Sequence, residues 1–192
     1  MKAFNGMKPK KSTSARELLP AGGYVAKIMK AEEVIYDWGK VVIISFDISE
    51  GEFKEFFAKD YRGQTQEDKK WRGVYRLIEP KDDGSEKDEW TKNSFNNSIW
   101  SIEESNPGYH FDWDETKFKG KFVGVLFREK EWAYEGNTGW TTECCALTDI
   151  GSIRNKTFKV PKKKPLKDSE RPAAASAVFE PAAEEDSGDL PF

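Results

Sequence analysis

The chain has 192 residues, which is room for one domain with tails or for two very small domains. Charged residues make up 34% and apolar residues 37% of the sequence, and this polar balance favours one folded domain with disordered ends. A formal net charge of −3 argues against a histone-like protein that binds polyanions through bulk positive charge. No stretch approaches the roughly 18 to 20 apolar residues of a membrane span, and the first residues lack a signal-peptide apolar region. We therefore expect a cytosolic protein without membrane contact.

Charge is distributed unevenly along the chain. Residues 1–17 carry five basic side chains against Glu17 alone, which is typical of a flexible basic arm. From Pro165 onward seven acids stand against two bases, and the composition predicts a disordered acidic tail over residues 161–192. Residues 18–160 are expected to form the folded domain.

Three strands are expected in the first part of this domain. Residues 24–36 mix β-branched and aromatic side chains with charges, which indicates a long strand, and residues 37–39 form a hairpin turn. Residues 40–49 place alternate apolar side chains on one face at period two: Val42, Ile44, Phe46 and Ile48. A third strand is predicted over residues 53–61.

A helix and a hairpin are expected to follow. A short helix carrying Trp71 and Tyr75 is one interpretation of residues 65–78, although Gly73 disfavours it. Asp88 is the predicted N-cap of a longer helix, in which apolar side chains recur at helical spacing until Asn106-Pro107-Gly108: Phe95, Ile99 and Ile102. Residues 118–128 and 140–147 read as two strands joined by a turn around residues 135–139.

The order of these elements resembles the oligonucleotide/oligosaccharide-binding (OB) fold. That fold is a five-stranded Greek-key barrel with one helix between its third and fourth strands. The expected fold is therefore mainly β, with this barrel flanked by the basic arm and the acidic tail.

The last nine residues carry four acids and end on Asp189-Leu190-Pro191-Phe192. This ending resembles the acidic C-terminal tip of bacterial single-stranded DNA-binding proteins, which closes with Asp-Ile-Pro-Phe. The resemblance implies that the tip recruits host proteins of DNA replication, recombination and repair, with these contact residues: Asp186, Asp189, Leu190, Pro191 and Phe192. A terminal Phe presents a ring and a carboxylate together, which suits an apolar pocket rimmed by cations. The small size suggests a phage or a mobile element in a bacterial host, and the alternative is a solubility tail.

A protein that holds single-stranded DNA without sequence preference needs exposed rings for the bases and interspersed cations for the phosphates. The chain contains seven Trp, six Tyr and thirteen Phe, more than a small core usually needs. The predicted DNA-binding residues lie in the first turn, around residues 61–76 and in the last hairpin: Trp38, Lys40, Tyr61, Arg62, Lys69, Lys70, Trp71, Arg72, Tyr75, Arg76, Arg128, Lys130, Trp132 and Tyr134.

Several of these assignments have alternatives. Trp71 and Tyr75 would be core residues if the short helix formed, and nearby Glu129, Glu131 and Glu135 would repel phosphate. The remaining rings on or beside the long helix are expected to pack inward: Trp90, Trp100 and Trp113.

We expect no enzymatic activity and no cofactor. The adjacent cysteines, Cys144 and Cys145, do not have the spacing of metal ligands. The best enzymatic alternative is a metal-dependent nuclease that uses Asp47, Glu52 and Lys54, because carboxylates across a hairpin can hold Mg²⁺. Another alternative is a protein-interaction module that does not bind DNA.

Overall fold

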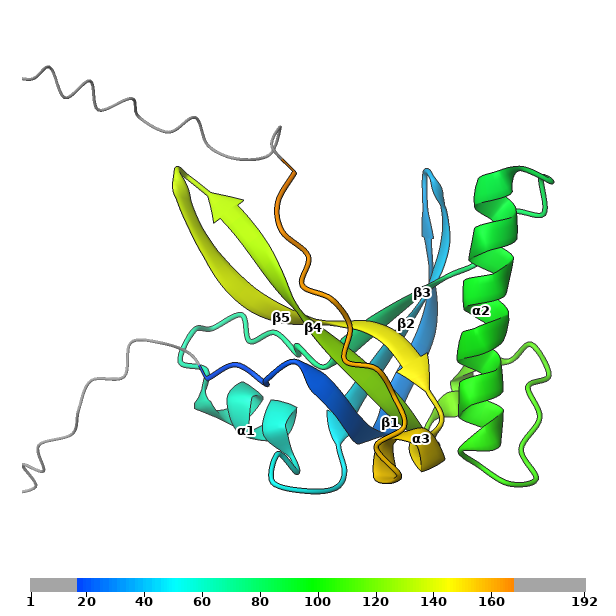
Figure 1. Ribbon diagram of the computed structural model, residues 1–192, viewed down its shortest axis with the longest axis horizontal. Helices are drawn as coiled ribbons and strands as arrows, with labels where there is room; N and C mark the ends of the chain where they lie inside the picture. The colour runs from blue at the N-terminus through cyan, green and yellow to red at the C-terminus, as the bar shows by residue number, and fades with distance from the viewer. Residues whose placement is uncertain (1–16, 168–192) are drawn as a thin grey trace, which may run out of the picture.

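The computed structural model describes residues 17–167, in which five antiparallel strands form one curved sheet in the order β3-β2-β1-β4-β5 (Figure 1). The strands are β1 (Gly22–Tyr36), β2 (Gly39–Ile48), β3 (Val74–Ile78), β4 (Phe122–Tyr134) and β5 (Asn137–Thr148). The helices are α1 (Phe56–Gly63), α2 (Glu86–Glu104), α3 (Ile150–Arg154) and a 3-10 helix over Glu115–Phe118. The expectation of a mainly β chain is confirmed, and α2 follows the third strand as predicted.

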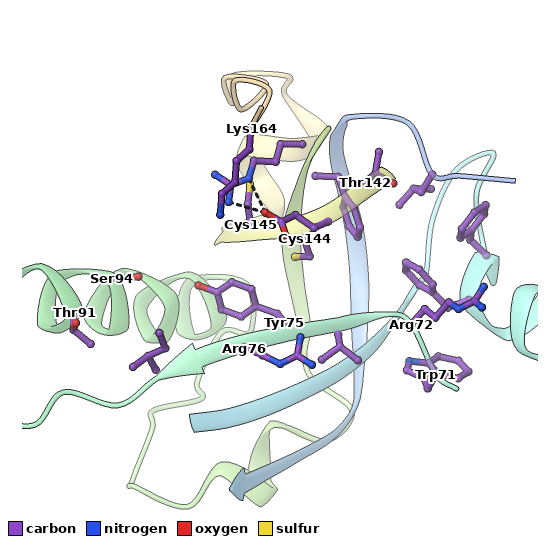
Figure 2. Close-up of a pocket in the computed structure, with 18 of the residues that line it drawn as sticks. Trp71, Arg72, Tyr75, Arg76, Thr91, Ser94, Thr142, Cys144, Cys145 and Lys164 are labelled. Atoms are coloured by element: carbon purple, nitrogen blue, oxygen red, sulfur yellow. Dashed lines mark hydrogen bonds and ion pairs between the residues drawn. The ribbon is translucent and has the colours of Figure 1, made fainter. Parts of the chain in front are cut away.

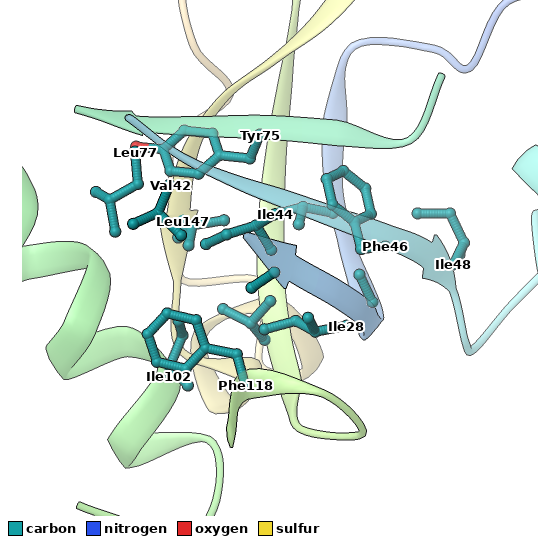
Figure 3. Packing of buried hydrophobic residues seen from close by; sticks show 14 of the residues in the cluster. Ile28, Val42, Ile44, Phe46, Ile48, Tyr75, Leu77, Ile102, Phe118 and Leu147 are labelled. Carbon is teal, nitrogen blue, oxygen red and sulfur yellow. The ribbon is translucent and has the colours of Figure 1, made fainter. Parts of the chain in front are cut away.

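The core lies on the concave face of the sheet (Figure 3). The alternation predicted for β2 is confirmed, because Val42, Ile44, Phe46 and Ile48 are all buried. Side chains from the other strands, from α2 and from the 3-10 helix complete the cluster, among them Ile28, Leu77, Ile102, Phe118 and Leu147. Removal of this apolar surface from water is the main stabilising contribution to the sheet.

The sheet is not closed by hydrogen bonds into a barrel. Among residues 17–167, strands β3 and β5 are the two edges of the sheet, and each pairs with one neighbouring strand only, β3 with β2 and β5 with β4. Some Cα atoms of β3 nevertheless lie within 8 Å of Cα atoms of β5. The two edges therefore face each other across a narrow opening.

The prediction of a third strand over residues 53–61 is wrong. These residues turn and then form α1, in which Phe56 and Phe57 are buried. The Asp47 carboxylate of β2 accepts hydrogen bonds from the backbone N–H groups of Phe57 (2.9 Å) and Ala58 (3.1 Å). The Asp47 carboxylate thus accepts from backbone N–H groups that have no partner within the first turn of α1. The sequence of residues 53–61 alone does not reveal this contact.

The alternative helix over residues 65–78 is also wrong, because residues 74–78 are the true third strand. They pair with β2 from Val74 opposite Ser45 to Ile78 opposite Val41. Their side chains alternate in burial, with Tyr75 and Leu77 inward and Arg76 and Ile78 outward. The period is that of a strand.

Helix α2 begins earlier than predicted, with Ser85 rather than Asp88 as its N-cap. The Ser85 hydroxyl accepts a hydrogen bond from the Asp88 backbone N–H at 3.2 Å. The buried Asp88 carboxylate instead accepts from the backbone N–H groups of Lys81 (2.9 Å) and Asp82 (3.0 Å) and pairs with Lys92 at 3.1 Å. This carboxylate ties the loop after β3 to the first turns of α2.

The start of the predicted tail lies along β4. The Lys164 backbone N–H donates to the Glu129 carbonyl at 2.8 Å, and the Glu131 backbone N–H donates to the Lys164 carbonyl at 2.9 Å. Strand β1 pairs with β4 only up to Phe127. The segment around Lys164 therefore pairs with the part of β4 that follows Phe127. Within residues 17–167, no helix is both long enough and apolar enough to cross a membrane.

Replacing Asp47 with asparagine should lower the free energy of unfolding by about 1 to 2 kcal/mol, because the cap of α1 is weakened. Urea unfolding of the variant measures this change. Glu52→Gln is the matched control, since Glu52 is an exposed acid in the following turn. Equal stability of Asp47→Asn and the wild type would contradict the capping role.

Candidate functional site

A groove of about 770 Å³ separates the edge strands β3 and β5 (Figure 2). Its walls come from β3, β5 and the N-terminal half of α2, with α1 and the segment before β3 at one end. Five charged side chains line the groove, and only one of them is acidic: Arg72, Arg76, Arg128, Lys164 and Glu143. The groove is therefore cationic although the chain as a whole is acidic.

Arg76 is a cation of this groove that is available to a ligand. It is exposed on the outer face of β3, between the side chains of Val74 and Ile78. Its guanidinium makes no hydrogen bond or ion pair with any residue from 17 to 167. Tyr75, by contrast, is only 8% exposed and its hydroxyl lies 3.4 Å from Ser98 Oγ, so its ring belongs to the core.

The opposite wall holds a compact ion-pair cluster. Arg128 donates from Nε and Nη2 to Glu143 Oε1, at 3.0 and 2.7 Å, and Lys130 Nζ lies 2.9 Å from Glu143 Oε2. Burial alone would raise the pKa of Glu143, but hydrogen bonds from Lys130 and Arg128 lower it below its usual range. Glu143 is thus ionised at neutral pH and holds both cations beside the groove.

Trp71 closes the end of the groove near α1. Its Nε1 donates to the carbonyl oxygens of Phe46 and Gly73, both at 3.1 Å, so the indole is fixed. The Tyr61 ring lies 5.9 Å from the Trp71 ring, and Lys69 Nζ lies 5.8 Å from the Tyr61 centroid. The structure therefore brings these predicted residues together on the surface.

Three predicted cations in this region have acidic partners. The pairs are Arg72 with Asp60 at 3.2 Å, Lys70 with Asp68 at 3.8 Å, and Arg62 with Glu55 at 4.0 Å. The last two pairs are solvent-exposed, and exposed pairs are weak enough for a phosphate to compete with them.

A second groove, of about 350 Å³, lies beside the tip of the β1–β2 hairpin and adjoins the first groove. Trp38 lines it, is 54% exposed and stacks on Tyr36 with ring centroids 5.3 Å apart. Ile78, Trp90 and Thr91 line both grooves. Lys40 lies outside both and pairs with Glu33 at 3.1 Å, which raises the pKa of Lys40.

The aromatic side chains of the last hairpin lie outside both grooves. Trp132 and Tyr134 are exposed on the β4–β5 hairpin, which extends to the same side of the molecule as the β1–β2 hairpin (Figure 1). Trp140 is covered in part by Lys163, whose Nζ lies 5.5 Å from the ring centroid. These rings form a separate arm rather than a wall of the groove.

The expectation that the remaining tryptophans pack inward is wrong. Trp90, Trp100 and Trp113 are 68%, 55% and 82% exposed. The helical repeat of Phe95 and Ile102 already contains the signal, since a stripe through these residues leaves Trp90 on another face of α2. Trp90 is therefore a groove residue that sequence reasoning missed.

Asp47, one of the residues proposed for a nuclease, has a structural role. Both Asp47 oxygens are used by backbone N–H groups at the start of α1. Among the residues that the structure describes, no group of three or more His, Cys, Asp or Glu side chains could hold a metal ion. Burial raises the pKa of Cys144 well above its usual value, so this thiol is not an activated nucleophile.

Residues 1–16 and 168–192, which include Asp186, Asp189, Leu190, Pro191 and Phe192, lie outside the described residues. A comparison with known protein families and with curated proteins gave no match. The functional assignment therefore depends on the geometry of the grooves.

Proposed function

We propose that this protein binds single-stranded DNA without sequence preference. The observation that carries the proposal is the cationic groove between β3 and β5, with the half-buried Trp71 at one end and the exposed Trp90 where it meets the second groove. A flexible strand presents phosphates and base faces at the same time, and this groove offers guanidinium groups and indoles within one surface. Aromatic stacking accepts every base, which explains why such a site needs no base-specific hydrogen bonds.

The strand order supports an OB-fold interpretation of the sheet. That fold is a partly open barrel whose ligand crosses strands two and three and the loops that join strands one to two and four to five. The corresponding parts here are the outer face of β2 and β3, the hairpin that carries Trp38, and the hairpin that carries Trp132 and Tyr134. Arg76, Trp38, Trp132 and Tyr134 lie on these parts.

A titration with oligo-dT tests this function directly. Tryptophan emission should be quenched as bases stack on the exposed indoles, and the affinity should fall as the salt concentration rises. Oligonucleotide degradation in the presence of Mg²⁺ would favour the nuclease alternative instead. No change in tryptophan emission on addition of oligo-dT at low salt would overturn the proposal.

Replacing Glu143 with glutamine should strengthen oligo-dT binding, by roughly threefold to tenfold at low salt. In the wild type, a phosphate must compete with the Glu143 carboxylate for Arg128 and Lys130. The variant keeps the size of the side chain but releases both cations. Titrations at two salt concentrations measure the effect, and Glu52→Gln controls for the loss of one negative charge far from the groove. Weaker binding by Glu143→Gln would show that the carboxylate positions Arg128 rather than competes with DNA.

The acidic tail extends the proposal to partner proteins. We propose that Phe192 and the acids before it recruit host replication, recombination or repair enzymes to the coated strand. A pull-down from a bacterial lysate with the full chain and with a chain lacking residues 184–192 tests this role. The same proteins captured by both chains would argue for a solubility tail.

A peptide is the second candidate ligand, because the outer edges of β3 and β5 both face the groove. An extended peptide could add a strand to either edge. The affinity for a peptide would depend little on salt concentration. Oligo-dT would then not change the tryptophan emission, so the same titration separates the two candidates.

A further inference from the structure

The two grooves form one continuous surface. Ile78, Trp90 and Thr91 belong to the lining of both, so the path along the outer face of β3 leads from Arg76 over Ile78 to the space between Trp38 and Trp90. The proposed DNA site, on which this inference rests, therefore does not end at the sheet. It continues onto α2.

The second groove differs from the first in its chemistry. Its large apolar side chains are Trp38, Ile78 and Trp90, and all three are exposed. Its charged side chains are nearly balanced: Lys81 and Lys87 against Glu79, Asp83 and Asp88, of which Asp88 is paired with Lys92. Such a surface does not attract phosphate but suits the flat, apolar face of a base.

Trp90 is mounted on a rigid support. The buried carboxylate of Asp88, two residues earlier, holds the backbone of Lys81 and Asp82, and the Ser85 hydroxyl caps the first turn. The indole itself is exposed to solvent. A ring on a fixed backbone loses little conformational entropy on binding, which is typical of residues that contribute strongly to an interface.

We propose that Trp90 is a base-stacking residue, so that one end of the bound strand leaves β3 and lies between the indoles of Trp38 and Trp90. Phosphates then contact Arg76 and Arg128 in the first groove, while bases enter the second. Trp90 lies on α2, so this contact lies outside the strands and hairpin loops that bind the ligand in the OB fold.

Replacing Trp90 with alanine should lower the affinity for an oligo-dT that is long enough to span both grooves by about fivefold or more, the loss expected for one stacked base. Binding of a short oligo-dT, which can occupy the end of the first groove near Trp71 and Arg72, away from Trp90, should change much less. Trp100→Ala is the matched control, since Trp100 is exposed on the same helix but lines neither groove. Circular dichroism of both variants reports whether α2 is intact.

A crosslinking experiment provides a second readout that needs no variant. Ultraviolet irradiation of the wild-type complex with 5-iodouracil-containing DNA should attach the strand to Trp90, which peptide mass spectrometry identifies. If oligo-dT binds but Trp90→Ala matches Trp100→Ala and no crosslink forms at Trp90, the inference is wrong while the proposed function stands. If the wild type does not bind oligo-dT, both are wrong.

Discussion

Replacing Trp38 with alanine is expected to weaken oligo-dT binding by about 5-fold to 150-fold, which corresponds to about 1 to 3 kcal/mol for one stacked base. The indole lies at the tip of the β1–β2 hairpin, is more than half exposed, and stacks on Tyr36 at an interplanar angle of 8°. Tyr36 thus holds the ring flat beside the second groove. A base that stacks on the outer face of Trp38 would extend an existing aromatic stack.

Two variants test whether this effect comes from stacking. Trp38→Phe keeps a ring and should retain part of the affinity. Trp113→Ala removes an indole that is even more exposed and that also stacks on an aromatic neighbour, Phe95, but that lies outside both grooves. Trp113→Ala should therefore bind like the wild type. Equal losses in Trp38→Ala and Trp113→Ala would indicate a general change in the protein and would contradict a contact at Trp38.

Replacing Gly73 with alanine is expected to destabilise the domain by about 1 to 3 kcal/mol or more, the usual cost of overpacking. A Cβ atom at Gly73 would lie 2.2 Å from the Phe46 carbonyl oxygen and 2.6 Å from Phe57 Cδ2. The first contact is with backbone that cannot rotate away, because the Phe46 backbone N–H donates to the Gly73 carbonyl at 2.8 Å. The start of β3 must then move away from β2.

This displacement should also reduce DNA binding, since Trp71 is held by the Phe46 and Gly73 carbonyl groups. Gly63→Ala is the control: it adds the same methyl group at the end of α1, where nothing lies within 4 Å. It should be neutral or slightly stabilising, because alanine favours a helix. Urea unfolding and oligo-dT titration of both variants measure the two effects. Wild-type stability of Gly73→Ala would show that β2 and β3 separate at little cost.

The sequence alone determined those elements whose pattern is local. Alternating apolar side chains in residues 40–49 predict a half-buried strand wherever they occur, and Asn106-Pro107-Gly108 ends a helix by its own backbone restrictions. The exposure of Trp38 follows in the same way from its place in a two-strand turn. The cations Arg72, Arg76 and Arg128 were also found from sequence, because a stacking site needs charges near its rings.

The tertiary structure decided what depends on partners far along the chain. Residues 56–63 are helical because Asp47, on another element, caps them, and residues 74–78 are a strand because β2 supplies their hydrogen-bond partners. The opening between β3 and β5 exists only after the whole sheet has curved, so neither the groove nor the gathering of these cations along it had a local signature. Trp90 belongs to that groove for the same reason: a helical repeat tells which side chains leave the core, but only the packing of α2 beside β3 tells what surface they reach.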